Sequence, residues 1–367
     1  MNTRDFSEML KGCRPVKDKD GNIVVQSIMN MQVVTLTTDK EFSLDERFGN
    51  PLTALQASNS SYGQISFTNK EGKEVILPTQ MAVLTKQSAQ NHGMTKAGYM
   101  EKYASTTYHD AGCVQGGQTG YFRGTQEFRM LPITMREMVF DTVGQPSSYG
   151  RIYPAIQKLG QETQSNAGNY LNIYFDKYDK KLEQFIAHFE RPKNLIGIIV
   201  LIDGEIVAID KFPSFTYAEQ VWDVMIRDCY GSLAIISELK HKSSASEFTQ
   251  AYEALKVGYR ENLIDLLERA LKKTKKSMTD SVAERIQEIL ELQFDAILDT
   301  EGQSTSTRAP KSYILKDNDN NYIGQVITEN EFNHLVSIVK RERFNPDAYR
   351  EVSELRKKAK KMKNFSL

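Results

Sequence analysis

Hydrophobic residues are spaced differently along successive parts of the chain, and the spacing predicts where strands and helices lie. The first 110 residues carry β-branched runs such as "NIVVQSIMNMQVVTLTT", which are typical of strands. From Tyr149 to Phe189 the apolar spacing becomes three and four, so that "YLNIYFDKYDKKLEQFIAHF" gathers its aromatic residues on one helix face. A stripe of this kind predicts a helix face that is buried in a protein core.

The segment 194–212, "NLIGIIVLIDGEIVAIDKF", predicts a β-hairpin. Two apolar runs flank Asp203-Gly204, a dipeptide that accepts the positive φ angles of a type I′ turn. Because the first run is apolar on both faces, we expect it to form a central strand of a sheet. A helix is predicted next, with an apolar stripe that packs on this sheet: Val221, Trp222, Met225 and Ile226.

The last third of the chain carries further helical patterns. Two of them lie between Ser246 and Thr300, with Ser246 and Asp280 as predicted N-caps. Residues 302–310 have the composition of a linker, and residues 311–328 predict a second hairpin around an Asp/Asn turn. We expect a helix-rich tail after this hairpin.

Together these elements predict an α+β fold in which helices pack on an antiparallel or mixed sheet. At 367 residues the chain is long enough for two domains, or for one large domain with an appendage. We expect an α+β domain over residues 1–240, a helical extension over 241–301, and a hairpin with a basic helical tail over 302–367. The parts beyond residue 240 would form a mainly helical appendage with one hairpin.

Composition narrows the classes of partner. Lys+Arg and Asp+Glu both number 47, so the net charge gives no overall attraction to nucleic acid or to an anionic membrane. The basic tail at 356–363 could contact nucleic acid weakly, although such a run is more often a solvated helix end. The longest apolar run, Leu195–Ile202, falls well short of the roughly 20 residues that span a bilayer. With no apolar leader segment and only three distant cysteines, we expect a soluble cytoplasmic protein without a disulfide framework.

The segment "HDAGCVQGGQTGYFRG", residues 109–124, is the densest in glycine. It matches the spacing of a P-loop except that Gln118 replaces the lysine, and a neutral amide cannot balance phosphate charge. No apolar strand feeds the loop, so a P-loop is excluded. Two interpretations remain open: Gly112, Gly116 and Gly117 expose backbone N–H groups to an anionic ligand, or the segment is a surface loop.

Cys113 is the candidate nucleophile of this segment, with His109 as its candidate base. The alternative is that Cys113 is a small, semi-buried structural residue. Metal binding is not expected, because the five histidines show no metal-ligand spacing. The stretch 317–321, "DNDNN", lacks the glycine of a calcium loop and fits a polar turn better. No cofactor is implied.

Three motifs together resemble the domain family named for its association with ADP-ribosylglycohydrolases and rhodanese/phosphatase-superfamily proteins. The residues that carry the resemblance are Lys86, Gln87 and Asn91, then Cys113, Val114 and Gly117, then Gly150, Ile152, Tyr153 and Ile156, and finally the hairpin and helix over 196–234. The resemblance covers roughly residues 80–235. This chain departs from the family pattern at Gln115, where the family usually has glutamate, and it lacks the arginine of the first motif.

The resemblance implies a link to ADP-ribose and NAD metabolism, without an established reaction. It implies a concave site in which Lys86 offsets phosphate charge, Gln87 and Asn91 orient polar groups, and the loop 112–120, including Gln118, supplies backbone donors. Our leading hypothesis is therefore a domain that binds, or binds and processes, an ADP-ribose or NAD-like nucleotide.

The alternative hypothesis is a non-catalytic structural or assembly protein, for example of a phage particle or a multisubunit scaffold. Two features favour this hypothesis: the family motifs lack their usual glutamate and arginine in this chain, and the chain has an additional region beyond residue 240. Residues 241–367 would then make contacts in a homo-oligomer or with another subunit, and the protein would reside in the virion.

Overall fold

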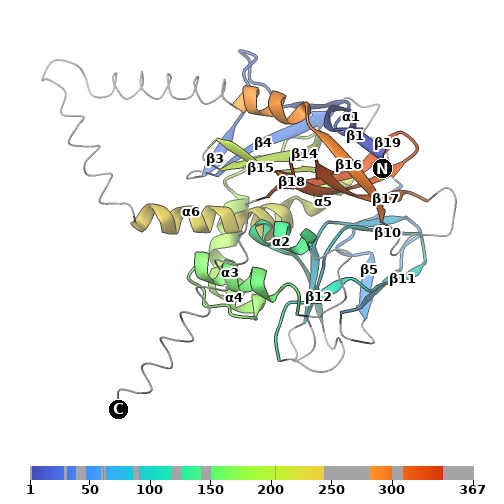
Figure 1. Ribbon diagram of the computed structural model, residues 1–367. Coiled ribbons are helices and arrows are strands. Elements are labelled where there is room, and N and C mark those ends of the chain that lie inside the picture. Colours follow the sequence, from blue (N-terminus) through green and yellow to red (C-terminus); the bar gives the residue numbers. More distant parts are fainter. Residues whose placement is uncertain are drawn as a thin grey trace, which may run out of the picture.

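The computed structural model describes most of the chain (Figure 1). The described residues are 2–28, 31–38, 47–58, 61, 63–85, 91–117, 122, 125–141, 150–202, 204–243, 282–299 and 309–341. Several predictions fall outside them: Asp203, the helical pattern from Ser246, most of the 302–310 linker, and the basic tail.

A large antiparallel sheet organises the molecule, and ten described strands form it. Along the sheet these are β1 (Asn2–Asp5), β16 (Gln293–Asp299), β17 (Lys311–Asp317), β18 (Tyr322–Glu329), β19 (Phe332–Lys340), β15 (Glu205–Lys211), β14 (Leu195–Ile202), β4 (Met31–Thr38) and β2 (Cys13–Pro15), while β3 (Gln26–Ile28) also pairs with β4. Both ends of the described chain contribute strands, so the sheet is assembled from distant parts of the sequence. The predicted α+β fold with an antiparallel sheet is confirmed.

The hairpin predicted over 194–212 is confirmed. β14 and β15 pair in antiparallel register, and Gly204 between them has φ +80°. β14 lies between β15 and β4, as its apolar character on both faces predicted. Ile198 and Ile199 illustrate the reason, since alternate side chains of a strand point to opposite faces and join different cores.

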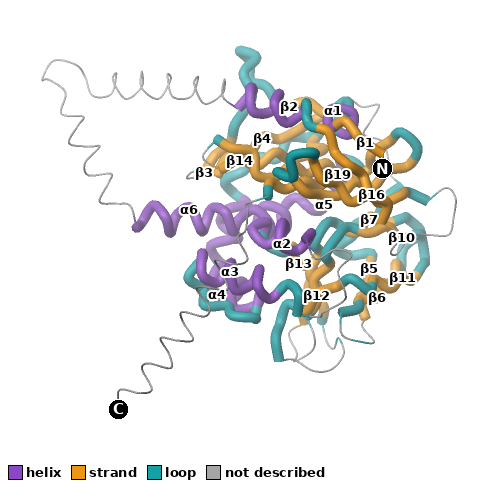
Figure 2. Tube along the Cα trace, viewed as in Figure 1, coloured by secondary structure: helices purple, strands orange, loops and turns teal. Residues whose placement is uncertain are grey.

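The two cores lie on the two faces of this sheet. On one face, the strands pack against helices α5 (Phe215–Val224) and α6 (Gly231–Ser243) and against smaller sheets, which lie below the large sheet in Figure 1. On the other face, α1 (Phe6–Met9) and a helix over residues 282–290 cover the sheet. Figure 2 shows the same arrangement, with purple helices on both faces of the orange strands of the large sheet.

The helices on the first face confirm most of the helical predictions. They are α2 (Arg136–Asp141) with the preceding 3-10 turn η2 (Ile133–Met135), α3 (Tyr153–Glu162), α4 (Leu171–Ile186), α5 (Phe215–Val224) and α6 (Gly231–Ser243). The aromatic stripe of α4 is largely buried, as are the four stripe residues predicted to follow the hairpin. Between α5 and α6 the structure inserts a π-helical segment, η3 (Met225–Tyr230), where a continuous helix was expected.

Three smaller sheets complete the first 130 residues. One contains β12 (Ala111–Cys113), β9 (His92–Met94), β8 (Met81–Thr85) and β13 (Gln126–Met130). A second contains β11 (Ser105–Tyr108), β6 (Ile65–Asn69) and β5 (Leu55–Ser58), and a third contains β10 (Gly98–Met100) and β7 (Val75–Leu77). The expected strand-rich N-terminal part is confirmed.

Two helical predictions beyond residue 240 are wrong. The helix expected to reach Thr300 stops at residue 290, and Gln293–Asp299 is strand β16. The segment after the confirmed β17–β18 hairpin is strand β19 rather than helix. A short apolar run fits the helical and the strand period equally well. Here β16 pairs with β1 and β17, and β19 pairs with β18 and β15, so that strand pairing satisfies their backbone groups.

The sheet crosses the boundary that we expected near residue 240, since β15 pairs with β19. The division of the chain into three parts stays a prediction. None of the described helices is long and apolar enough to cross a membrane.

Candidate functional site

The described residues 109–117 of the glycine-rich segment include β12, which pairs with β9 in the four-stranded sheet. A Cβ on Gly112 would lie 2.9 Å from Ile152 Cδ1, and a Cβ on Gly116 would lie 3.0 Å from Asn169 Cβ. These two glycines therefore allow close packing, while Gly117 adopts a positive φ of +73°. Packing and backbone geometry already account for all three glycines.

Two backbone donors of this segment are used inside the fold. Val114 N–H donates to Asn91 O at 3.0 Å, and Gly116 N–H donates to Asn169 O at 2.9 Å. An anion nest needs such N–H groups to face a ligand. The structure thus brings Asn91 next to the loop, as expected, but engages these donors in holding it.

Asn91 is itself buried and bonded within the protein. Its Oδ1 accepts from the Thr85 N–H at 2.8 Å and from Thr85 Oγ1 at 3.2 Å, while Nδ2 donates to Gln115 Oε1. The side chain therefore ties the end of β8 to the segment after β12. The other predicted ligand residues, Lys86, Gln87 and Gln118, lie outside the described part of the chain.

Cys113 and His109 occupy different environments. Cys113 is buried, and its thiol donates to Gln115 O at 3.1 Å, whereas His109 is exposed after β11. The residue in register with Cys113 is His92, whose ring meets Phe122 edge-on at 5.5 Å between centroids. Sequence reasoning missed His92, because a lone histidine in a strand gives no pattern.

A cavity lies away from the glycine-rich segment, where one end of the large sheet meets the helices. Its volume is about 480 Å³. We call it the sheet-end cavity, and its walls come from the β14–β15 hairpin, the end of β19, η2, α2, α3 and α6. It is lined by Ile133, Thr134, Glu137, Lys158, Glu162, Ile202, Glu205, Val207, Leu233, Ile236, Ser237, Val339, Lys340 and Arg341.

The lining of this cavity combines an apolar part with charges of both signs. Aliphatic side chains come from the sheet and from α6, and carboxylates come from Glu137, Glu162 and Glu205. Glu205 pairs with Lys340, and the hydrogen bond from this ammonium lowers the pKa of the Glu205 carboxyl. Such a site suits a ligand that has both a flat apolar group and ionised groups.

A buried ionic network next to the cavity fixes α2. Arg136 precedes the lining residue Glu137 and is fully buried, and its Nη1 donates to both oxygens of Asp210 at 2.9 Å. Burial by itself would lower the pKa of the Arg136 guanidinium, but the charge of Asp210, the hydrogen bond with it, and the neighbouring Cys229 and Tyr230 together raise it. The ion pair therefore joins α2 to β15.

The π-helical segment η3 supplies the remaining partners of this network. Tyr230 OH donates to Asp210 Oδ2, and Arg136 Nη2 lies 3.0 Å from Cys229 Sγ. Burial raises the pKa of Cys229 to about 12, so the thiol stays protonated at neutral pH. Cys229 is therefore a structural residue here.

The same segment reaches a second network. Asp228 is fully buried between Arg129 and Arg227, with Arg129 Nε 3.2 Å and Arg227 Nε 2.7 Å from its carboxylate. Burial raises the pKa of Asp228, while the hydrogen bond from Arg227 and the charge of Arg129 oppose that rise. η3 is thus held on one side by hydrogen bonds of Tyr230 and Cys229 to the Arg136–Asp210 pair and on the other by the ion pair of Asp228 with Arg129.

The model of one protein family matches residues 22–306, which is most of the chain. The chain belongs to the ARG and Rhodanese-Phosphatase-superfamily-associated Protein domain family, ARPP-1. The expected resemblance is confirmed at this level and extends further in both directions than residues 80–235. No curated protein and no solved structure matches the chain.

The ARPP-1 match includes the glycine-rich segment and most of the sheet-end cavity. Val339, Lys340 and Arg341 line the cavity from beyond the matched region. No pattern in the sequence could have found this cavity, because its walls come together only when β19 pairs with β15. Within the described residues, no group of three or more His, Cys, Asp or Glu side chains could hold a metal ion.

Proposed function

We propose that this ARPP-1 protein binds an ADP-ribose or NAD-like nucleotide in the sheet-end cavity. The cavity volume of about 480 Å³ is the observation that carries the proposal. It falls in the range of roughly 300–1,000 Å³ that is typical of small-molecule sites. The family's association with ADP-ribose metabolism, implied by the resemblance, supplies the ligand class.

The lining supports a division of the ligand into two parts. Ile202, Val207 and Leu233 offer an apolar surface for a base. Lys158 and Arg341 offer cationic groups for a pyrophosphate, and an arginine fork fits phosphate oxygens well. The carboxylates of Glu137 and Glu162 are the side chains that would accept hydrogen bonds from ribose hydroxyls.

Calorimetry and thermal-shift measurements with ADP-ribose, NAD, AMP and phosphate test this proposal. Ligand at about 100 times its Kd stabilises the fold by roughly 2.7 kcal/mol, which is readily seen. We expect binding of ADP-ribose or NAD and a loss of at least about tenfold in Lys158→Ala, because a charge-assisted hydrogen bond is worth roughly 1.5–3 kcal/mol. Lys193→Ala is the matched control, since the exposed Lys193 precedes the opposite end of β14.

A third variant separates this site from the one that the resemblance implied. If Lys86→Ala abolishes binding while Lys158→Ala and Arg341→Ala leave it intact, the ligand sits at the glycine-rich segment instead. Absence of binding by all four compounds would contradict the nucleotide proposal as a whole. Product analysis after incubation with NAD and ADP-ribose tests for turnover in the same samples.

An exposed corner of the large sheet favours a second candidate function, as a structural or assembly protein. Ile297 and Leu298 of β16 are each 46 % exposed. β1 pairs with β16 only from Gln293 to Ala296, so the next residues have no described strand on that side. Open strand edges with exposed aliphatic residues pair with other chains.

Light scattering tests this second function. An assembly protein would form a defined oligomer that Leu298→Lys dissociates, whereas Lys316→Ala on the neighbouring strand would leave it intact. A monomer at all concentrations would contradict it.

A further inference from the structure

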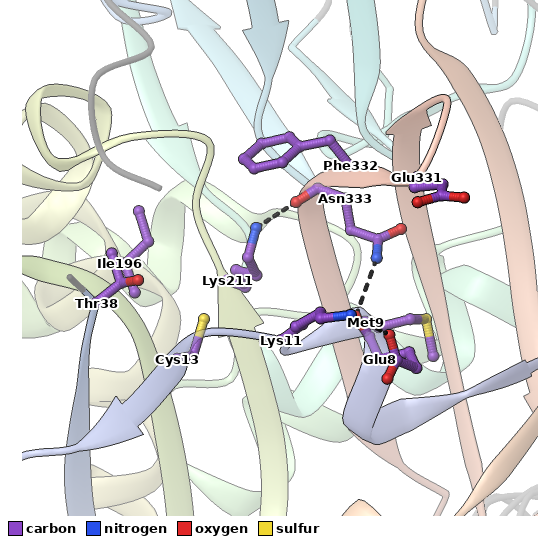
Figure 3. A pocket seen from close by; sticks show the side chains of 10 residues that line it. All are labelled: Glu8, Met9, Lys11, Cys13, Thr38, Ile196, Lys211, Glu331, Phe332 and Asn333. Atoms are coloured by element: carbon purple, nitrogen blue, oxygen red, sulfur yellow. Dashed lines mark hydrogen bonds and ion pairs between the residues drawn. The ribbon is translucent and has the colours of Figure 1, made fainter. Parts of the chain in front are cut away.

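A second, smaller cavity lies on the opposite face of the large sheet from the buried ionic networks. We call it the Lys211 cavity (Figure 3). Its volume is about 40 Å³, which is room for about three water-sized groups. It is lined by Glu8, Met9, Lys11, Cys13, Thr38, Ile196, Lys211, Glu331, Phe332 and Asn333.

Lys211 is the unusual residue of this cavity. Its side chain is buried, with 6 % of the residue exposed, and Nζ donates to the backbone carbonyl of Asn333. The Phe332 ring lies 5.1 Å from Nζ. Among the residues that the structure describes, no carboxylate forms an ion pair with it.

Burying an ammonium group without a counter-ion is energetically unfavourable, so burial shifts the protonation equilibrium toward the neutral amine. Burial lowers the pKa of Lys211, and the neighbouring Cys13 opposes this only in part. A neutral lysine amine is a nucleophile toward carbonyl carbon, which an exposed lysine at neutral pH is not.

The rim of the cavity selects among carbonyl compounds by charge. Lys11 is paired with Glu8 at 3.2 Å, so its charge is balanced, and Glu331 adds a further negative charge. An anionic ligand such as a 2-oxo acid meets repulsion there, whereas an uncharged aldehyde does not.

We propose that Lys211 forms an imine with a small, uncharged aldehyde that enters this cavity. The amine lone pair forms a bond to the carbonyl carbon, and the carbonyl oxygen takes a proton as its π bond breaks. Nitrogen then loses its protons and the hydroxyl group leaves as water, so that one aldehyde is bound and one water is released. Glu331 at the rim is the carboxylate that can carry these protons to and from solvent.

Hydride trapping on the unaltered protein tests the proposal, so that no variant has to fold. The protein is incubated with dilute acetaldehyde at neutral pH, reduced with borohydride, digested, and analysed by peptide mass spectrometry. We expect Lys211 to carry the ethyl group at the highest occupancy of the lysines, above that of exposed Lys193, since a lowered pKa leaves more of the amine neutral. Labelling of exposed lysines with Lys211 unlabelled would overturn the proposal.

Pyruvate provides the test of charge selection at the same residue. We expect pyruvate to label Lys211 less than acetaldehyde does, and Glu331→Gln to narrow that difference. If pyruvate labels Lys211 better than acetaldehyde, the assignment to uncharged aldehydes is wrong. Neither result depends on nucleotide binding at the sheet-end cavity.

Discussion

Asp210 and Lys211 are neighbours on β15, and both are buried, but the two faces of the sheet treat their charges differently. Asp210 points to the face with the larger core, where Arg136 and Tyr230 bond to its carboxylate. Lys211 points to the other face, where it meets a carbonyl, an aromatic ring and a small cavity. Among the described residues, the Asp210 carboxylate therefore has a partner of opposite charge and the Lys211 amine has none.

We interpret this difference as a difference in role between the two buried groups. A matched buried pair specifies how elements dock, since removing either partner leaves an uncompensated charge in the core. An unmatched buried charge stabilises nothing, and such groups with shifted pKa values are typical of functional sites. We therefore interpret the Arg136–Asp210 pair as structural and Lys211 as chemical.

Disrupting the Arg136–Asp210 ion pair should lower the stability of the protein more than any other change considered below. Arg136→Ala leaves Asp210 buried without its partner, and we expect a loss of about 3–5 kcal/mol in the free energy of unfolding. Urea denaturation followed by circular dichroism measures it. The double variant Arg136→Met/Asp210→Leu removes both charges and should recover much of the loss. An Arg136→Ala protein as stable as the unaltered one would show that the pair does not stabilise the docking of α2 on β15.

We expect a smaller loss of stability at low pH, caused by protonation of His334 on β19. Burial, together with the charges of Arg47 and Lys211, lowers the pKa of His334 from 6.5 to about 4, although Glu329 opposes the shift. The unfolded chain therefore binds a proton first, so the stability present above pH 6.5 is lost as the pH falls toward 4. The loss can reach roughly 3 kcal/mol, at about 1.4 kcal/mol per pKa unit.

Denaturation at pH 7, 6 and 5 measures this effect, with His334→Phe as the comparison. The variant should lose less stability than the unaltered protein over this interval, because phenylalanine cannot take up a proton. Equal slopes for the two proteins would rule out His334 as the titrating group.

The smallest effect is expected from removing the unmatched charge. Lys211→Met keeps the length of the side chain and removes the amine, and we expect stability at pH 7 to stay the same or to rise by about 1 kcal/mol. The lowered pKa of Lys211 means that the unfolded chain binds more protons. Stability of the unaltered protein should therefore increase with pH toward 10.5, relative to the variant.

Both proteins are compared in a Cys13→Ser background, because Cys13 has a raised pKa and would add a change of opposite sign above pH 9. A marked loss of stability in Lys211→Met would show that the charge is matched after all.

The sequence predicted those elements whose signal is local. Asp203-Gly204 between two apolar runs was enough for the β14–β15 hairpin, and the three-and-four spacing was enough for α4. The helix assigned to Gln293–Asp299 failed, because that segment takes its form from β1 and β17, far away along the chain. The sheet-end cavity could not be predicted for the same reason: Ile133 and Arg341 both line it although 208 positions separate them (341 − 133).

Sequence patterns were sufficient for the α+β class, the family, and the elements whose hydrophobic period is long enough to be unambiguous. They did not show that β16 and β19 are strands, that both ends of the described chain share one sheet, or that Asp210 is paired while Lys211 is not, because these features depend on tertiary contacts. The physical reason is that propensity and periodicity act between near neighbours, whereas burial and charge pairing depend on residues that only folding brings together.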